Sequence, residues 1–346
     1  MSGQGAVPAA ASAERQLIDL MTGFWRTQSL YVATELGILD HLDESRPMSG
    51  AEVALGLNLN TDAVTRLLGY LASLEVISGD DTAGYVLGEM GALLRTGAPS
   101  AMRDHMLLYG NQFYRAWGEL ASSVRHGGST FARVFGADLF SYLREHPDTS
   151  HSYERMMAAG LPFFTEVRRV FDFSAAELIV DVAGGHGALL DQILAGNPGP
   201  RAMLFDVPHV VREARHYPIA LDHAERCDLV GGDFFAGVPD GGDVYLLSRI
   251  LHCFDDEACH RILVNCRSAM AADGSLVILE RIIGAGATRL AHGFDMHMLV
   301  VLGGGRERDE TQYKAMLDKA GFELERVHLL PLDTHLLVAT PRADHH

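Results

Sequence analysis

The chain has 346 residues, of which 48% are hydrophobic and 21% are charged, so it can bury one large core or two ordinary ones. Its formal net charge of −17 opposes binding to nucleic acid phosphates or to an anionic membrane surface, so we expect neither as a partner. No apolar run reaches the roughly 20 residues of a membrane span. The four cysteines form no CxxC pair, which is typical of a reduced cytoplasmic protein.

The N-terminal part of the chain has a helical pattern. It runs from Glu14 to Leu42, and its apolar surface is wider than one stripe, which favours burial against a second copy of the chain. Two shorter helices should follow, the first capped by Ser49 and the second by Thr61. Val76–Ile77 and Tyr85–Leu87 predict a small hairpin. Helices followed by a hairpin are typical of a winged helix.

Many winged helices bind DNA, so a metabolite-sensing regulator is one alternative function. Residues 46–100, however, contain three arginines against six acidic residues, a net charge of −3. A domain that binds DNA needs a basic stripe on its surface. We therefore expect residues 1–105 to form a winged-helix dimerisation domain that makes the protein a homodimer.

A second domain is expected to cover residues 106–346. Its first part, residues 106–175, is mostly helical in pattern and rich in aromatic residues, and should contribute to the pocket of a flat substrate. Strands then alternate with helices, which predicts an α/β fold with a doubly wound, Rossmann-like sheet and ligands at the carboxyl ends of its strands. The predicted strands are Leu178–Val182, Ala202–Phe205, Cys227–Val230, Val244–Ser248 and Ser275–Glu280, followed by an antiparallel pair, Phe322–Leu329 and Thr334–Ala339.

The turn after the first of these strands predicts a nucleotide site. Residues 178–187 read LIVDVAGGHG, and the glycines let the chain turn sharply and let a ligand approach the backbone. Asp181 precedes this turn, and Asp206 ends the next strand, where a carboxylate can accept hydrogen bonds from ribose hydroxyls. Asp233 can accept one from an adenine amine while Phe234 packs on the ring. The GxGxxG and GxxxxGK patterns are absent, so NAD and ATP fit less well.

These motifs resemble those of the S-adenosylmethionine-dependent O-methyltransferases, which include plant caffeate enzymes and bacterial enzymes acting on anthracyclines, mitomycins and phenazines. The most specific pieces are VDVAGGHGALL, FDVPHV, GGDFF, SRILHCFDDEACHRIL, VILERII and GGGRERDETQY. The resemblance implies a class I methyltransferase fold, S-adenosylmethionine as cofactor, S-adenosylhomocysteine as product and a small aromatic or polyketide-like acceptor. It implies no metal, and the set of His292, Asp295 and His297 matches no standard zinc spacing.

The resemblance also implies roles for residues of the cofactor site. Asp181 and the 183–187 loop should hold the methionine part, Asp206 the ribose, and Asp233 with Phe234 the adenine. Ser248 stands where plant enzymes have a lysine, and we expect Ser248 or the following arginine to touch the cofactor. The cofactor positions are then Asp181, Ala183, Gly184, Gly185, Gly187, Asp206, Asp233, Phe234, Ser248 and Arg249.

The LHxxxDE pattern after the fourth strand contains His252. A positioned histidine is suited to remove a hydroxyl proton near neutral pH. By resemblance, His252 is the general base, and Glu280 and Glu307 are the two acids that flank it. A carboxylate that is hydrogen-bonded to an imidazole fixes the tautomer and raises the pKa of the ring. Cys253 stands where the family commonly has Asp, so acceptor choice or rate can differ here.

For the acceptor pocket, the resemblance points to a set of mostly apolar residues, each of which has ordinary core packing as its alternative role. These residues are Met157, Cys253, His297, Met298 and Leu302. His186, where many relatives have Thr, Ser or Lys, is expected to face solvent. A further alternative is a relative that binds S-adenosylmethionine but catalyses hydroxylation, decarboxylation or cyclisation.

Overall fold

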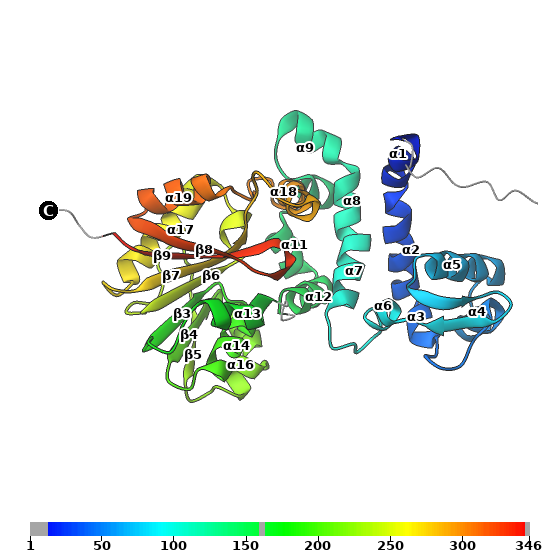
Figure 1. The fold of residues 1–346 in the computed structure, drawn as a ribbon, viewed down its shortest axis with the longest axis horizontal. Helices are drawn as coiled ribbons and strands as arrows, with labels where there is room; N and C mark the ends of the chain where they lie inside the picture. Colours follow the sequence, from blue (N-terminus) through cyan, green and yellow to red (C-terminus); the bar gives the residue numbers. More distant parts are fainter. Residues whose placement is uncertain (1–12, 159–162, 343–346) are drawn as a thin grey trace, which may run out of the picture. The chain divides into compact units, whose positions relative to one another are not determined.

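The computed structural model describes residues 13–158 and 163–342. The chain divides into two compact units, Met1–Tyr114 and Arg115–His346, and helix α8 (Gln112–Gly118) spans the boundary. The expected boundary at residue 105 lies inside helix α7 (Met102–Gly110), which packs along α2 of the first unit (Figure 1). In the described ranges, no helix has the length and apolar character needed to cross a membrane.

The first unit consists of helices and one hairpin (Figure 1). The long helix expected from Glu14 to Leu42 is interrupted at Thr22 and near Gly37, whose φ of 70° ends the regular helix. Strands β1 and β2 pair antiparallel, which confirms the hairpin, while the winged-helix assignment stays a prediction. The elements are α1 (Ala13–Met21), α2 (Gly23–Glu35), α3 (Ile38–His41), α4 (Gly50–Leu57), α5 (Thr61–Ser73), β1 (Ile77–Asp80), β2 (Gly84–Leu87), α6 (Glu89–Ala92) and α7.

Side-chain caps start α4 and α5. Ser49 and Glu52 form a capping box: the Ser49 hydroxyl accepts from the backbone N–H of Glu52 at 3.2 Å, and the Glu52 carboxylate accepts from the backbone N–H of Ser49 at 2.7 Å. The cap of α5 is Asn60, whose Oδ1 accepts from the backbone N–H of Ala63 at 2.9 Å. The prediction of Thr61 as this cap is wrong because Thr61 is already helical, whereas a cap residue is extended.

The second unit begins with helices and continues into a seven-stranded sheet (Figure 1). The helices before the sheet, which confirm the helical prediction, are α9 (Leu120–His126), α10 (Thr130–Phe135), α11 (Leu139–Glu145), α12 (Pro147–Ala158) and α13 (Phe163–Val170). The sheet and its helices comprise β3 (Leu178–Val182), α14 (Ala188–Gly196), β4 (Arg201–Asp206), α15 (Pro208–Ala214), α16 (Pro218–Leu221), β5 (Cys227–Gly231), β6 (Val244–Ser248), η1 (Leu251–Cys253), α17 (Asp256–Ala269), β7 (Ser275–Arg281), α18 (Arg289–Leu302), α19 (Glu310–Lys319), β8 (Phe322–Leu329), η2 (Pro331–Asp333) and β9 (Thr334–Pro341).

The strand order is β5-β4-β3-β6-β7-β9-β8. Strands β5, β4, β3, β6 and β7 are parallel to one another, whereas β9 runs antiparallel to β7 and β8. Strand β3 pairs with β4 on one side and with β6 on the other, so the winding of the chain reverses between β3 and β6. Doubly wound sheets bind ligands in the crevice at this switch point, outside the carboxyl ends of the strands.

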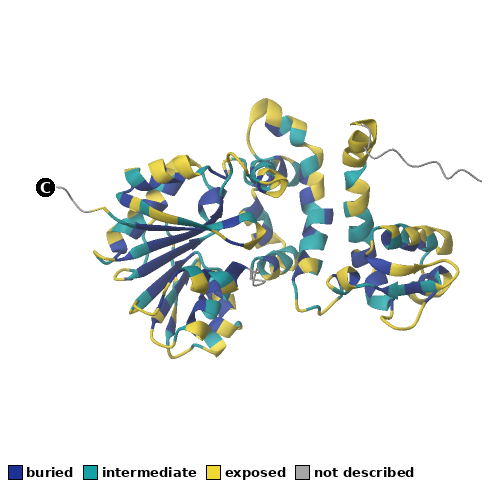
Figure 2. Ribbon diagram, viewed as in Figure 1, coloured by how far each residue is buried: buried dark blue, intermediate teal, exposed yellow. Residues whose placement is uncertain are grey.

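Alternate residues of the strands face opposite layers of helices. In β3, Ile179 packs in the cluster that contains Leu190 of α14, whereas Val180 packs in the cluster that contains Ile262 of α17. Figure 2 shows the central strands of the sheet as buried and the outer faces of the helices as exposed. A sheet that is close-packed on both faces gives its strand ends a rigid base.

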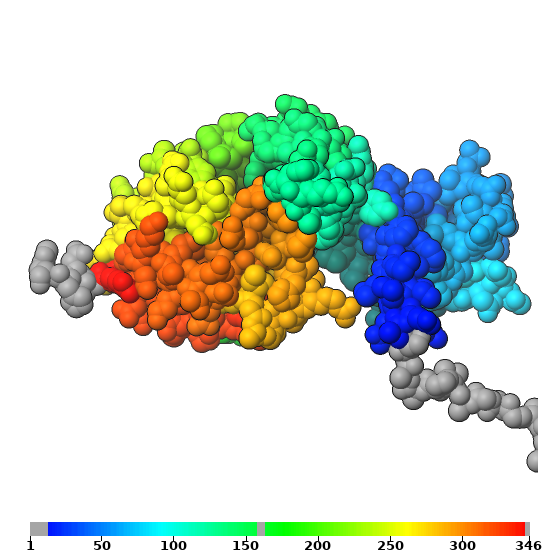
Figure 3. Space-filling view, turned by 90° about the horizontal axis from the view of Figure 1, so that it is seen from above, coloured from blue at the N-terminus to red at the C-terminus, as the bar shows by residue number. Residues whose placement is uncertain are grey.

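Helix α18 was not anticipated as an element, although three predicted pocket residues lie on it. It packs beside α9 and α10, and Figure 3 shows these segments in contact at the surface of the second unit. Ser129 and Thr130 donate hydrogen bonds to the carbonyls of Val301 and Val300 at 2.6 Å and 3.2 Å. The helical segment before the sheet therefore holds α18 in place.

Candidate active site

The turn after β3 lets a ligand approach the backbone closely. Ala183, Gly185 and Gly187 have φ values of 57°, 59° and 77°, in the left-handed region that favours glycine. A Cβ atom added at Gly184 would lie 2.5 Å from the carboxylate of Asp181. No side chain fits there, so the loop leaves the Asp181 carboxylate close to bare main chain.

Asp181 carries a deeply buried carboxylate. It is 1% exposed, and neither of its oxygens has a hydrogen bond within the described residues. Burial, with a smaller contribution from Asp206, raises its pKa to about 7. Burying a carboxylate without compensation costs free energy. Asp181 is therefore suited to a cationic ligand at this turn.

Two further acids follow the neighbouring strands. Asp206 ends β4, where one oxygen accepts from the backbone N–H of Gly185 at 2.9 Å and the other from that of Val207 at 2.7 Å. Burial raises the pKa of Asp206, and these two bonds partly offset the effect. Asp233, after β5, is exposed, and the following Phe234 is half-buried. Because β3, β4 and β5 are adjacent and parallel, the three acids lie along one edge of the sheet.

Ser248 and Arg249 lie on the other side of the switch point, at the end of β6. The Arg249 guanidinium donates to the carbonyl of Met157 on α12 at 3.0 Å, and burial lowers the pKa of Arg249. The hydroxyl oxygen of Ser248 and Nε of Arg249 are buried, and neither has a hydrogen-bond partner within the described ranges. Both can therefore take a polar atom of a ligand.

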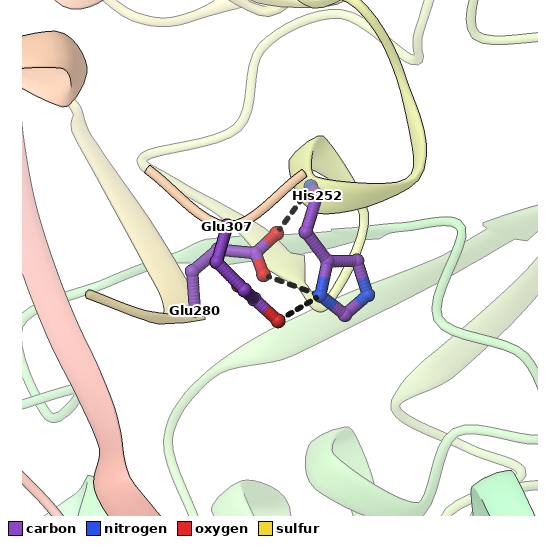
Figure 4. Close-up of side chains that lie close together, drawn as sticks. All are labelled: His252, Glu280 and Glu307. Atoms are coloured by element: carbon purple, nitrogen blue, oxygen red, sulfur yellow. Dashed lines mark hydrogen bonds and ion pairs between the residues drawn. The ribbon is translucent and has the colours of Figure 1, made fainter. Parts of the chain in front are cut away.

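His252 lies in η1, directly after β6, between two buried glutamates (Figure 4). Its Nδ1 is 3.1 Å from Oε1 of Glu307 and 3.3 Å from Oε2 of Glu280. The backbone N–H of His252 donates to the other oxygen of Glu280 at 3.2 Å. Carboxylates only accept, so Nδ1 carries the proton, and Figure 4 shows the second ring nitrogen facing away from both acids.

The two glutamates make His252 a stronger base. Burial lowers the pKa of His252, but the charge of Glu280, with help from Cys253 and Glu307, outweighs burial and raises the pKa well above its usual value. Burial also raises the pKa of Glu280, while the imidazole counteracts that effect. The ligand atoms of the three residues lie within 4.8 Å of one another, close enough for a metal ion. The proton on Nδ1 accounts for the same short distances.

The predicted acceptor residues lie on three elements. His297 and Met298 are buried on α18, Leu302 is half-buried at the end of that helix, and Cys253 and Met157 are half-buried in η1 and α12. His297 is near His252, whose charge contributes to lowering the pKa of His297.

Trp117, which the sequence did not single out, fixes the tautomer of His297. Its indole N–H donates to Nδ1 of His297 at 3.2 Å. Because an indole can only donate, Nδ1 must be unprotonated and the proton lies on Nε2. Burial, with the nearby His252, lowers the pKa of His297 to about 4. His297 is thus a neutral hydrogen-bond donor near neutral pH.

The prediction that His186 faces solvent is wrong. Its side chain is 2% exposed, and Nε2 lies 3.8 Å from the carboxylate of Glu154 on α12. The ring stacks on Tyr217 with 4.0 Å between centroids. Burial lowers the pKa of His186, and Glu154 partly counteracts it. Both partners are distant in the sequence, so no local pattern could have shown the contact.

Comparison with known proteins identifies the family. Residues 117–323 match the family model of the O-methyltransferase domain, and residues 18–97 match that of the O-methyltransferase dimerisation domain. The chain belongs to the O-methyltransferase family.

Individual relatives of this family cover nearly the whole chain. The 3-amino-4-hydroxybenzoate 4-O-methyltransferase of Streptomyces cremeus is 58% identical over 96% of this chain and 91% of its own. The solved mitomycin 7-O-methyltransferase is 30% identical, with a TM-score of 0.88 over 96% of this chain and 98% of its own. Human N-acetylserotonin methyltransferase, solved with S-adenosylmethionine, is 27% identical, with a TM-score of 0.88 over 98% of this chain and 100% of its own. The fold is that of class I methyltransferases, and the family depends on S-adenosylmethionine.

The cofactor edge of this O-methyltransferase fits S-adenosylmethionine. The cofactor carries a sulfonium and an ammonium group, and Asp181 offers a buried carboxylate that no described residue of the chain hydrogen-bonds. It also carries a carboxylate, and Arg249 offers a buried guanidinium with an unused donor at Nε. The glycine turn brings bare main chain against the Asp181 carboxylate, since a Cβ at Gly184 would lie 2.5 Å from it.

We expect affinity for S-adenosylmethionine to follow the ionisation of Asp181. The carboxylate is charged above its pKa of about 7, so affinity should rise about tenfold from pH 6 to pH 8. Calorimetric titration of the wild type and of Asp181→Asn separates this effect from titration of the cofactor itself. The neutral variant should bind S-adenosylmethionine more weakly than the wild type at pH 8. Its affinity should not show the tenfold rise from pH 6 to pH 8. Equal pH slopes in both proteins would contradict this role.

Glu307→Gln should move the acid limb of the rate profile to lower pH. His252 must be neutral at Nε2 to accept a proton, so kcat/KM rises as pH rises through the pKa of His252. The glutamates hold that pKa above its usual value, and removal of one charge lowers it. The variant should therefore reach a lower plateau at a lower pH. If the acid limb of the kcat/KM profile stays at the same pH in Glu307→Gln, Glu307 does not raise the pKa of His252.

Proposed function

We propose that this chain transfers a methyl group from S-adenosylmethionine to a phenolic hydroxyl of a small aromatic acid, for which 3-amino-4-hydroxybenzoate is the first candidate. The observation that carries the proposal is His252, held between Glu280 and Glu307 after β6. The identity of 58% with the aminohydroxybenzoate enzyme supports the acceptor class.

His252 acts as the general base. A phenol has a pKa near 10, so it keeps its proton at neutral pH unless a base removes that proton as the methyl group is transferred. Nε2 of His252 receives the proton, while Glu280 and Glu307 hold Nδ1–H and stabilise the imidazolium. S-adenosylmethionine, when bound, supplies an electrophilic methyl carbon. Holding the hydroxyl in line with that carbon supplies much of the remaining acceleration.

The cofactor roles follow the edge of the sheet. Asp181 and the main chain of the 183–187 loop hold the methionine part, together with Ser248 and Arg249 across the switch point. Asp206 binds the ribose hydroxyls. Asp233 and Phe234 hold the adenine. The glycines of the loop keep side chains out of the space that the cofactor needs.

The acceptor site is formed by Met157, Cys253, His297, Met298 and Leu302. Methionines adapt to a flat ring, and the neutral Nε2–H of His297 can donate to a polar substituent. Cys253 replaces the aspartate that is common in the family. An acceptor that carries its own carboxylate is repelled less by a thiol than by a second carboxylate. This departure therefore favours an aromatic acid.

Neither alternative function has comparable support. The contacts of His252 with two acids favour proton removal from a hydroxyl, which methyl transfer to oxygen needs. A regulator that binds DNA needs a basic surface, and residues 46–100 have a net charge of −3.

Release of S-adenosylhomocysteine tests the acceptor. We expect turnover of 3-amino-4-hydroxybenzoate and an O-methyl product by mass spectrometry and NMR. Three analogues serve as matched controls. The first, 3-aminobenzoate, lacks the hydroxyl and should be inert, and the second, 2-aminophenol, lacks the carboxylate and should show a higher KM. The third, 4-hydroxybenzoate, lacks the amine and shows whether the amine contributes to turnover. Turnover of 3-aminobenzoate, or an N-methyl product, would contradict the proposal.

His252→Ala tests the base in the same assay. Methyl transfer should fall about 10²–10⁴-fold, which is the usual contribution of general acid–base catalysis. The affinity for S-adenosylmethionine should stay within about twofold because His252 is not among the cofactor residues. Unchanged turnover would remove His252 from the mechanism.

We also propose that the protein is a cytoplasmic homodimer. Helix α1 buries none of its residues, and Leu17, Ile18, Leu20 and Met21 are 57%, 59%, 67% and 64% exposed. An apolar patch of this kind indicates a partner surface, and the match to the dimerisation domain supports a second copy as the partner. The four cysteines are free, which agrees with a reducing compartment.

Charged substitutions on α1 should dissociate this dimer. Ile18→Glu combined with Leu20→Glu places two carboxylates in the apolar patch, and light scattering after gel filtration should then give the monomer mass. Leu329→Glu is the matched control, since Leu329 is 71% exposed on β8, outside the dimerisation match. The wild type and this control should give twice the monomer mass, and a monomeric wild type would rule the proposal out.

A further inference from the structure

Arg308 is among the largest fully buried side chains of the described residues, with 1% of its surface exposed. It directly follows Glu307, and its backbone forms a parallel bridge with Ile282 just beyond β7. A guanidinium stays charged in proteins, so burial is tolerated only where its donors are used. The groups that accept from Arg308 therefore show what the residue holds.

The guanidinium of Arg308 holds both ends of η1. It donates to the carbonyl of Leu251 at 2.9 Å through Nη1 and to the carbonyl of Phe254 at 2.8 Å through Nη2. Nε and Nη2 also donate to Asp256 at 3.0 Å and 2.8 Å. His252 lies between the two carbonyls, so the planar fork fixes the main chain on both sides of the base.

The residues before Arg308 hold His252 from other directions. The backbone N–H of Arg306 donates to the His252 carbonyl at 2.9 Å. Gly305 permits this approach, since a Cβ at Gly305 would lie 2.6 Å from that carbonyl oxygen. The carboxylate of Glu307 contacts the imidazole. One short segment, residues 305–308, thus holds the ring, the carbonyl and both flanks of His252.

We propose that Arg308 is a positioning residue that sets the place of the His252 ring for proton transfer. The proposal rests on the role of His252 under the proposed function. Arg308 does not touch the ring, so it acts through the main chain of η1. Lysine carries one point charge and cannot reach two carbonyls and a carboxylate together.

Arg308→Lys should lower kcat about 10–100-fold, because a shift of about 1 Å in a catalytic group can cost that much. The calorimetric affinity for S-adenosylmethionine should change less than about twofold, since Arg308 lies outside the cofactor edge. Arg326→Lys is the matched control, because Arg326 is exposed on β8 and belongs to no part of the site. It should leave kcat unchanged. An unchanged kcat in Arg308→Lys would overturn the proposal.

A double variant distinguishes positioning from general damage. If Arg308 acts through His252, the variant with both His252→Ala and Arg308→Lys should be no slower than His252→Ala alone. Multiplied losses would overturn the proposal. A harmless His252→Ala would instead reject the proposed base itself, so the two failures can be told apart.

Acceptor acidity gives a second readout. The loss in Arg308→Lys should shrink for an acceptor whose hydroxyl is already ionised at the assay pH, because no proton then needs removal. An equal loss of kcat for an acceptor with an ionised hydroxyl and for one with a protonated hydroxyl would overturn the proposal. If Arg308→Lys does not fold, Asp256→Asn carries the same test, since the Asp256 side chain is 73% exposed and anchors the guanidinium. Asp256→Asn should lower kcat less than Arg308→Lys does, and it should not lower kcat further when His252→Ala is already present. An unchanged kcat in Asp256→Asn would contradict the positioning role of Arg308.

Discussion

The site depends on the contact of Nδ1 of His252 with Glu307 at 3.1 Å and with Glu280 at 3.3 Å. Two buried carboxylates so close together would repel each other without a positive group between them. The sheet brings them together because β6 and β7 are adjacent and parallel, so Glu280 at the end of β7 lies beside η1 after β6. The segment that carries Glu307 then closes over the same turn. The fold thus supplies both halves of the pair, and the imidazole makes their burial tolerable.

The same chemistry is left incomplete on the other side of the switch point. Asp181 is as deeply buried as the two glutamates, but no protein cation compensates its charge within the described residues. The charges of the two glutamates are therefore compensated by His252, whereas the charge of Asp181 can be compensated by a ligand. This contrast agrees with the two proposed roles, a base at His252 and a cation-binding carboxylate at Asp181. The pairing of β3 with β6 sets the distance between Asp181 and His252.

The sequence predicted the parts of the fold that depend on local pattern. Apolar runs bounded by turns located Leu178–Val182 and Val244–Ser248 at their observed bounds. His252 and its two acids came from the family resemblance, and the structure brings them together, although their roles remain proposals. Long-range contacts were out of reach. The burial of His186 depends on contacts with α12 and Tyr217. The contacts of Arg308 are made to main-chain carbonyl groups, which a pattern of residue types does not show.

The glycine at position 305 has a consequence for laboratory evolution of this enzyme. Libraries that vary this position are expected to lose activity whatever the acceptor, because any side chain would push on the His252 carbonyl. The proposed acceptor residues of α18, such as Met298, lie on a helix that α10 contacts. The same helix is tied to the catalytic segment, because Asp295 of α18 accepts from the backbone N–H of Glu307 at 2.9 Å. A search for new acceptors can therefore vary α18 positions such as Met298 while it keeps Asp295 and residues 305–308.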